Sequence, residues 1–360
     1  MVDRGFGIEV EDTYGESVAK SAFAPDWWTD ADSVNFALND DPVIKSGTSR
    51  MNKRARAGIL KPTGSTQAEA DLEKLAWYFF GFLDNYVCTE GDTPATGHLQ
   101  TYIHEFYGGE GKELPSFRGI AVYDMLKKYI YGMLIDGLKL EASDDSVSVS
   151  ADWIYKTEKA GIIGSSGETF TRPDALDEEI FLMFYDIKLY LGTTTSNSVT
   201  SPKLLDGVGT ALSYEGKNNF DVDGTIGFGS RAPQAKAQAG KRENSLSVTT
   251  TLTADTVRSI LNAEYGEVNA LEPSSCKLLQ QPFEIDIALC EDSDIGCKII
   301  FPKCALKVTY DMSGADKIEA TLSLDTLGSD TVTLEDGTTT VETDMYIRLV
   351  NYQEEIEAKE

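Results

Sequence analysis

The 360-residue chain has few of the residues from which catalytic and metal sites are commonly built. It contains five cysteines and two histidines. His98 and His104 lie close together with no cysteine nearby, which leaves little for a catalytic triad or a histidine-based metal site. His104 also alternates with its neighbours as a strand residue does, which favours a structural role. We expect no cofactor, no resident metal and no enzyme activity.

The cysteines are odd in number, and no pair has the close spacing of a zinc ribbon. Cys290, Cys297 and Cys304 are spaced by seven on strand-like segments. Their thiols would therefore either meet at a metal or act as small buried hydrophobes. Buried thiols are the commoner arrangement, so we expect reduced cysteines that pack in the interior.

Basic residues and long apolar runs are also scarce. Lys and Arg total 32 against 59 Asp and Glu, and the net charge is −27. Nonspecific binding to nucleic acid needs cations at the phosphates, so this balance opposes it. No run approaches the roughly 18 apolar residues of a membrane span, and residues 1–5 lack a basic region followed by an apolar run. We expect synthesis in a cytoplasm and no membrane anchoring.

What the chain does have is strand-like alternation of apolar and polar residues. It is clearest at residues 146–150, 246–250, 283–287 and 306–309. Helical periodicity is limited to two segments. Residues 66–83 carry a strong apolar stripe with Ser65 as the expected cap, and a weaker helix is expected from Thr253 to Gly266. The sequence therefore predicts a mainly β protein.

The order of elements repeats, because each predicted helix follows one strand and precedes two more. The segment at Phe117 resembles the one at Phe283, 166 residues further on, and the segment at Leu138 resembles the one at Leu306, 168 residues further on. We predict two tandem domains, each a β-sandwich or partial barrel with one packed helix. The predicted boundaries are residues 5–163 for domain one, 164–183 for a linker, 184–351 for domain two and 352–360 for an acidic tail.

Nine of the 32 basic residues fall in two clusters, one before each predicted helix. The clusters are Arg50, Lys53, Arg54, Arg56 and Lys61, then Arg231, Lys236, Lys241 and Arg242. Both lie in Gly-, Ser- or Ala-rich sequence that is typical of exposed loops. They are either solvated loops or basic arms, at about residues 46–61 and 230–243, that contact acidic surfaces of neighbouring copies. Their repetition favours basic arms.

Short motifs in a fixed order resemble those of the phage tail tube protein family across nearly the whole chain. They include an opening strand with a Thr-Tyr-Gly turn, a His-containing strand and a Leu-Pro-Ser-Phe element. Their positions are residues 7–15, 101–106, 114–117, 184–189, 218–219, 231–233 and 350–351. Residues 193–209 have no counterpart and are interpreted as an insertion.

The resemblance implies a structural virion protein that is made in the host cytoplasm and assembled into a tail. Its inner sheets would join into a β-barrel around a lumen, and rings would stack into a tube. Double-stranded DNA would pass through this lumen without specific binding, because an acidic lumen repels phosphates. Relatives with one domain form rings of six, so a duplicated chain is expected to close a ring with three copies. A tape measure protein and tail terminator or tip proteins are the implied partners, and the basic arms would join subunits or rings.

One alternative is a surface or secreted β-sandwich that binds carbohydrate or a host receptor. Its stacking faces would come from the four tryptophans, Trp27, Trp28, Trp77 and Trp153. Core packing explains Trp77 and Trp153 more simply, and one of the adjacent Trp27 and Trp28 is expected at a subunit interface.

The other alternative is an enzyme. Its only raw material is the acidic pairs at residues 40–41, 144–145 and 354–355. Such pairs mostly form turns or solvated tails, and no nucleophile or phosphate-binding loop accompanies them.

Overall fold

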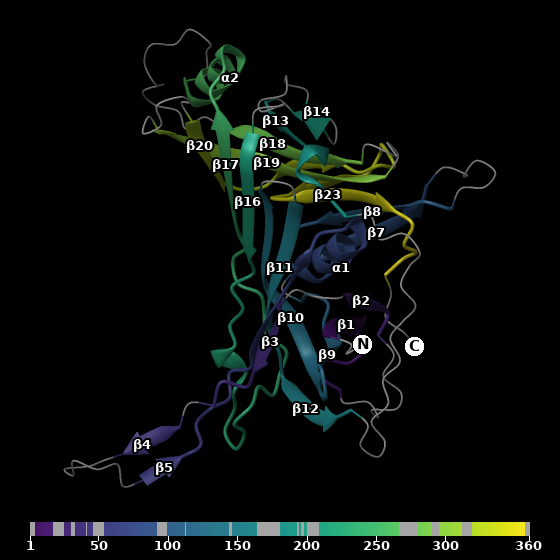
Figure 1. The fold of residues 1–360 in the computed structure, drawn as a ribbon, viewed down its shortest axis with the longest axis vertical. Helices are drawn as coiled ribbons and strands as arrows, with labels where there is room; N and C mark the ends of the chain where they lie inside the picture. The colour runs from purple at the N-terminus through teal and green to yellow at the C-terminus, as the bar shows by residue number, and fades with distance from the viewer. Residues whose placement is uncertain are drawn as a thin grey trace.

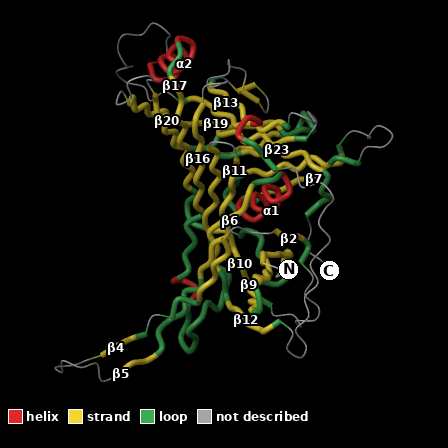
Figure 2. The backbone as a smooth tube through the Cα atoms, in the orientation of Figure 1, coloured by secondary structure: helices red, strands yellow, loops and turns green. Residues whose placement is uncertain are grey.

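The computed structural model describes most of the chain, namely residues 4–16, 25–29, 33–40, 42–45, 54–91, 99–111, 113–143, 146–163, 181–192, 194–195, 198–199, 209–265, 280–289, 295–311 and 319–356. The fold is mainly β, as predicted, with large antiparallel sheets (Figures 1 and 2). No helix among these residues is long and apolar enough to cross a membrane.

The longest sheet, here called the long sheet, contains eight antiparallel strands. Two of them are halves of long strands that also take part in other sheets. The order is β3 (Ser33–Ala37), β6 (Thr63–Glu69), β11 (Ser146–Ile154), the C-terminal half of β10 (Leu126–Ser143), β16 (Gly209–Lys217), β17 (Glu243–Thr251), β20 (Glu319–Thr326) and the C-terminal half of β19 (Gly296–Asp311).

The N-terminal halves of β10 and β19 continue into further sheets. That of β10 pairs with β9 (Phe117–Tyr123) and β12 (Thr157–Ile162), and β9 continues through β1 (Arg4–Val10) to β2 (Trp27–Thr29). That of β19 pairs with β18 (Gln281–Ala288) and β23 (Tyr346–Asn351). From there β18 continues to β13 (Ile187–Leu191), and β23 continues through β8 (Tyr102–Tyr107) to β7 (Asn85–Glu90). Three separate hairpins are β4–β5 (Val43–Lys45, Arg54–Arg56), β14–β15 (Thr194–Thr195, Ser198–Val199) and β21–β22 (Asp330–Thr333, Thr340–Thr343).

The order of strand pairings occurs twice along the chain. In the first half β3 pairs with β6, β6 with β11, β11 with β10, β10 with β9 and β12, and β9 with β1. In the second half β16 pairs with β17, β17 with β20, β20 with β19, β19 with β18 and β23, and β18 with β13. The registers agree as well, since Phe117 lies opposite Met133 as Phe283 lies opposite Phe301.

The two halves also share ladders and a core. β10 pairs with β16 and β8 pairs with β23 across the halves. One hydrophobic cluster includes Phe6, Phe79 and Trp153 together with Phe301 and Leu349. The first and second halves are therefore packed against each other rather than linked only by a connecting segment.

Helix α1 (Leu72–Phe82) is shorter than predicted and begins later. Asp71 caps it by accepting a 2.7 Å hydrogen bond from the Lys74 amide. The predicted start at Thr66 and the cap at Ser65 are wrong, because both residues lie in β6, which pairs on both sides with β3 and β11. Tertiary pairing here overrides local helical periodicity.

Helix α2 (Ala254–Tyr265) matches the prediction at its start. Thr253 Oγ1 accepts the Thr256 amide at 3.2 Å. The predicted stop at Gly266 lies outside the described residues.

Several other sequence predictions concern the ends and insertions of the chain. Most of the predicted insertion 193–209 lies outside the described residues, apart from the short β14–β15 hairpin and Gly209. The start of the predicted acidic tail is packed on the first half, because Ile356 is buried and its amide donates to the Tyr86 hydroxyl at 3.1 Å. Residues 357–360 lie outside the described part.

Candidate functional site

The long sheet has one apolar face and one polar face, set by alternation along each strand. The apolar face carries α1, with the Tyr78 ring 6.2 Å from that of Trp153, and the helix lies to one side of the tall sheet in Figure 1. On the opposite side, here called the polar face, Ser and Thr are the commonest residues. One cross-strand row reads Glu69, Ser148, Glu141, Ser213, Ser247, Ser323 and Lys307. We take this broad surface as the candidate functional site.

Acidic residues outnumber basic ones on the polar face. In the described strands it carries eight carboxylates, namely Glu69, Glu141, Asp152, Glu215, Glu243, Asp311, Glu319 and Asp325. It carries three lysines, namely Lys139, Lys217 and Lys307. Lys139 Nζ lies 2.7 Å from Glu141, and Lys217 Nζ lies 2.7 Å from Glu215. Two of the three cations are therefore paired within the face, which leaves an excess of negative charge.

The crowding of carboxylates perturbs their titration. Partial burial raises the pKa of Asp152, and repulsion from Asp136 raises it further. The hydrogen bond from Lys217 lowers the pKa of Glu215, and the same contact raises that of Lys217. The excess of carboxylates makes this a surface that repels anions.

The long sheet ends in two edge strands, and each of them has one apolar side and one polar side. Among the described residues, β3 pairs only with β6, and the C-terminal half of β19 pairs only with β20. On β10, Leu138, Leu140 and Ala142 are at most 2% exposed, and β16 continues the sheet beside them. At the matching positions of β19, Leu306 and Val308 are only partly buried and Tyr310 is 47% exposed. The β19 edge therefore leaves apolar surface uncovered.

The predicted basic residues lie in two loops of the described chain. We call residues 38–62, between β3 and β6, arm one, and residues 218–242, between β16 and β17, arm two. Arg50 and Lys53 of arm one lie outside the described residues, as does the side chain of Arg54, while Arg56 is exposed. In arm two Lys241 is exposed, and Lys236 is partly buried with a pKa lowered by that burial.

Two of the predicted cations, Lys61 and Arg231, are engaged between the two arms of the same chain. Lys61 Nζ lies 2.7 Å from Asp223, an exposed pair worth roughly 0–1 kcal/mol. Arg231 lies 2.6 Å from Asp40 and donates to the Gly58 carbonyl at 2.8 Å. Its hydrogen bond is the main reason why the pKa of Asp40 is lowered. These contacts bring arm one and arm two together.

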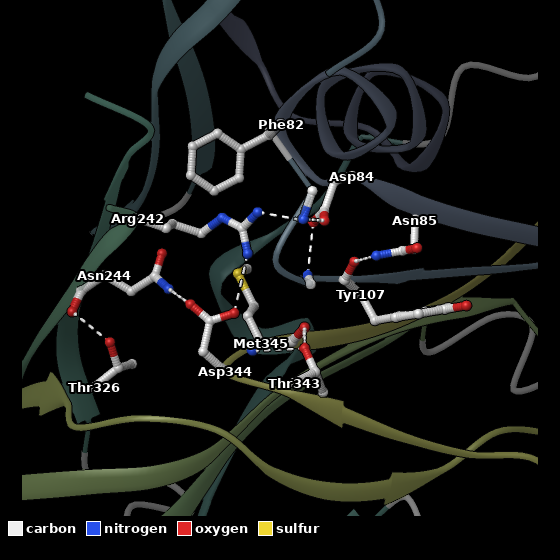
Figure 3. Close-up of polar contacts among 12 residues, drawn as sticks. Phe82, Asp84, Asn85, Tyr107, Arg242, Asn244, Thr326, Thr343, Asp344 and Met345 are labelled. Atoms are coloured by element: carbon white, nitrogen blue, oxygen red, sulfur yellow. Dashed lines mark hydrogen bonds and ion pairs between the residues drawn. The ribbon is translucent and has the colours of Figure 1, made fainter. Parts of the chain in front are cut away.

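Arg242 is not the solvent-facing loop cation that the sequence predicted. Its side chain is 10% exposed, and the guanidinium lies 3.0 Å from both Asp84 and Asp344, with the Phe82 ring beside it (Figure 3). Asp84 follows α1 in the first half, and Asp344 precedes β23 in the second. Arg242 therefore ties the base of arm two to both halves.

No sequence pattern points to the partners of Arg242. Asp84 is 158 residues away and Asp344 is 102 residues away. The same holds for Asp40, which meets Arg231 only because the two arms lie together. Single acidic residues in an acidic chain carry no pattern that would single them out.

The tryptophans do not supply a surface for ligand stacking. Trp27, Trp28, Trp77 and Trp153 are all at most 8% exposed. The expectation that one of the adjacent pair lies at a subunit interface is not met, because Trp27 packs in the main core and Trp28 in a second buried cluster. The tryptophans therefore do not form the aromatic glycan platform of the alternative hypothesis.

His104 and two cysteines are interior residues, as predicted. The His104 ring is fully buried and makes hydrogen bonds with the Tyr86 hydroxyl, the Asn351 side chain and the Gln353 carbonyl. Cys297 and Cys304 are free and buried, and burial raises the pKa of Cys304 to about 12. Cys88 is free and partly exposed, whereas Cys276, Cys290 and His98 lie outside the described residues.

Comparison with known proteins adds no relative from which a role for the polar face could be taken. No protein-family model matches the chain, and no curated protein matches it. The tail tube resemblance therefore rests on the motifs named above, and the function has to be argued from the sheet and its edges.

Proposed function

We propose that this chain is the major subunit of a tail tube, a structural protein whose copies join edge to edge around a lumen lined by the polar face. The observation that carries the proposal is the joint between β10 and β16. There the first half of the chain adds four strands to four strands of the second half within one sheet. The β19 edge corresponds to the β10 side of that joint, and the β3 edge corresponds to the β16 side. The β3 edge of a second copy can therefore extend the sheet at β19 in the same way.

The repeated pairing order supports two tandem tube domains within the chain. Residues 5–163 and 184–351 each supply four strands to the long sheet, in the same order and register. An exposed edge strand is an aggregation hazard unless it is paired or covered. Pairing each β19 edge with the β3 edge of the next copy removes both edges of the long sheet once the ring closes.

The internal joint also gives the register of the proposed contact. At this joint Gly137 lies opposite Lys217, and Lys139 lies opposite Glu215. The matching residues in the pairing pattern are Ala305 and Lys307 on β19 and Ala37 and Asn35 on β3. We therefore expect Ala305 opposite Ala37 and Lys307 opposite Asn35 of the next copy. Leu306 and Val308 would then be covered as Leu138 and Leu140 are.

Ring size follows from the same argument. If each half stands for one subunit of a six-membered ring, three chains close it with approximate six-fold symmetry. Rings of this kind would stack into a tube, capped and measured by terminator, tip and tape measure proteins in the virion tail.

The polar face suits a conduit for DNA. Ser and Thr present short side chains without large apolar or cationic groups, and the carboxylates repel phosphates. Double-stranded DNA would slide past such a lining rather than bind. No arginine or aromatic side chain lies among the polar-face positions of the described strands, so neither strong phosphate binding nor base stacking is supported there.

Electron microscopy of the purified protein tests the proposal directly. We expect tubes with a central channel and three chains per ring. The informative variant is Val308→Asp, which puts a charge on the uncovered apolar side of the β19 edge. It should yield folded monomers without tubes. Stable monomers of the parent under all conditions, or rings of six complete chains around one lumen, would rule the proposal out.

A further inference from the structure

Arm one and arm two have the same base. Asn39 and Asn219 both have left-handed backbone conformations, with φ of 48° and 51°. The Asn39 side chain donates to the Lys61 carbonyl at 3.0 Å, and the Asn219 side chain donates to the Lys241 carbonyl at 2.9 Å. Each lysine is 22 residues beyond its asparagine. The arms therefore have equal length and a matching anchor, although their outer parts differ in conformation.

The base of arm one is occupied within the chain. The Leu60 amide donates to the Arg231 carbonyl at 2.7 Å, and the Arg231 side chain reaches Gly58 and Asp40. Lys61 pairs with Asp223. Arm two thus binds arm one at the joint where β10 meets β16.

The base of arm two has a hollow at the corresponding place. A cavity of about 420 Å³ is lined by residues 239–242 and Asn218 of the arm base, and Lys241 at its rim is exposed. Figure 3 looks into this region, with Arg242 and Asp344 in view. An adjoining hollow of about 370 Å³ is lined by Glu215, Glu243 and Asp325 together with Lys217, Lys241 and Arg242, and the two hollows together have six carboxylates against three cations.

The hairpin of arm one, in contrast, reaches away from its own chain. Strands β4 and β5 extend beyond β3, well clear of the sheets (Figures 1 and 2). Val43 is 53% exposed, Ile44 is 50% exposed and Arg56 is exposed as well. A projecting hairpin with an apolar side chain on each face and a nearby cation fits a surface that offers aliphatic side-chain stems and an excess of carboxylates.

We propose that the β4–β5 hairpin of one copy binds the base of arm two of the neighbouring copy, beside Lys241 and the cavity. The proposal rests on the edge-to-edge association proposed above, which brings the β3 edge and its arm one next to the second half of another copy. The matching anchors Asn39 and Asn219 align the two arms, so that Val43 of the neighbouring copy takes the place that Asp223 has in the internal contact. Lys241 then takes the place of Lys61. There Val43 would pack on the aliphatic stem of Lys241, as Asp223 pairs with Lys61.

Cross-linking between two singly substituted chains tests this contact. Val43→Cys and Lys241→Cys chains are mixed, assembled and treated with a short thiol-specific cross-linker. A cross-linked dimer is expected in tubes and should disappear when the chains are diluted to monomers. The matched control pairs Lys241→Cys with Ile162→Cys, because Ile162 is 59% exposed but belongs to β12 and to neither arm. The parent chain controls for its own cysteines.

The outcomes separate the two proposals. Tubes that give no Val43–Lys241 product, or no more than the Ile162 control, would overturn the hairpin contact and leave the tube function standing. Failure of the parent to form tubes would overturn both. As a second measurement, Val43→Lys puts a like charge beside Lys241 and should raise the protein concentration needed for tube formation about tenfold, equivalent to about 1.4 kcal/mol per contact. An unchanged threshold would also count against the contact.

Discussion

Arg242 and Asp84 form an ion pair at 3.0 Å in which the arginine side chain is 10% exposed and the aspartate side chain 3% exposed. Asp84 also accepts the amides of Gly109 and Gly111, at 2.7 and 2.8 Å. The pair therefore connects the end of α1, the loop after β8 and the base of arm two. Because the pair is enclosed, the loss of one partner should lower stability more than it would at an exposed ion pair.

Replacing Arg242 by Met should lower the free energy of unfolding by about 3 kcal/mol, because a buried carboxylate is left without its cation. The two amide hydrogen bonds to Asp84 soften the loss. Urea denaturation measures it. Lys241→Met is the matched control next in sequence, and its effect should stay within about 0.5 kcal/mol because the side chain is exposed. Equal effects of the two substitutions on the free energy of unfolding would show that the Arg242–Asp84 ion pair stabilises the fold no more than an exposed lysine does.

Much of the fold could be predicted from local sequence patterns and from the likeness between the two halves of the chain. Alternation predicted the β character, and the likeness of Phe117 to Phe283 located residues that occupy matching register positions. The start of α1 could not be found this way, because residues 63–69 are held as a strand by β3 and β11 on either side. Periodicity describes one segment at a time, whereas pairing depends on partners far along the chain.

The candidate site was less accessible to sequence reasoning. Alternating serines such as Ser148 and Ser150 are visible locally, but only the registers align them with Ser213 and Ser247 into one face. The basic arms were recognised by composition, yet composition did not distinguish Arg242, which is enclosed, from its exposed neighbour Lys241. That distinction depends on Asp84 and Asp344, which are remote in sequence.

The proposed register between copies can be tested with disulfides. Directly opposite residues in an antiparallel pair have Cβ atoms about 5 Å apart, which suits a disulfide, whereas diagonal neighbours are about 7–8 Å apart. Chains with Asn35→Cys and chains with Lys307→Cys should therefore form an intermolecular disulfide on mild oxidation of tubes. Asn35→Cys with Thr309→Cys is the diagonal control and should react less. If the diagonal pair reacts better, the register differs from that of the internal joint.

His104 should make the fold less stable at acid pH. Burial lowers the pKa of its imidazole in the folded chain below the ordinary value of 6.5. Below about pH 6.5 the unfolded chain therefore binds a proton that the folded chain resists, and stability falls by up to about 1.4 kcal/mol per pH unit until the folded pKa is reached. The contribution is fully present above that range and is lost as the pH decreases.

Urea denaturation at pH 7.5 and 5.5 measures this effect against His104→Gln. The variant should be less stable than the parent at pH 7.5, because it disturbs the contacts to Tyr86 and Asn351. It should nevertheless lose less stability between the two pH values. Carboxylates such as Glu11, whose pKa is raised by burial, change stability with pH in both proteins and cancel in the comparison. Parallel pH profiles would mean that His104 does not resist protonation.

Reversing charge on the polar face should turn a nonadhesive lining into one that binds DNA. Glu69 and Asp325 are exposed and occupy polar-face positions on β6 and β20. Changing both to Lys shifts the charge by four units per chain, repeated at every ring, and supplies the phosphate contacts that the parent lacks. Tubes of the double variant should cosediment with short double-stranded DNA at about 50 mM salt and release it at about 200 mM, because each contact displaces condensed counterions. The matched control is Asp12→Lys with Glu16→Lys, which makes the same charge change at exposed positions off the long sheet. If the control tubes bind DNA as well as the polar-face variant does, net charge alone decides binding and the polar face has no special part in it.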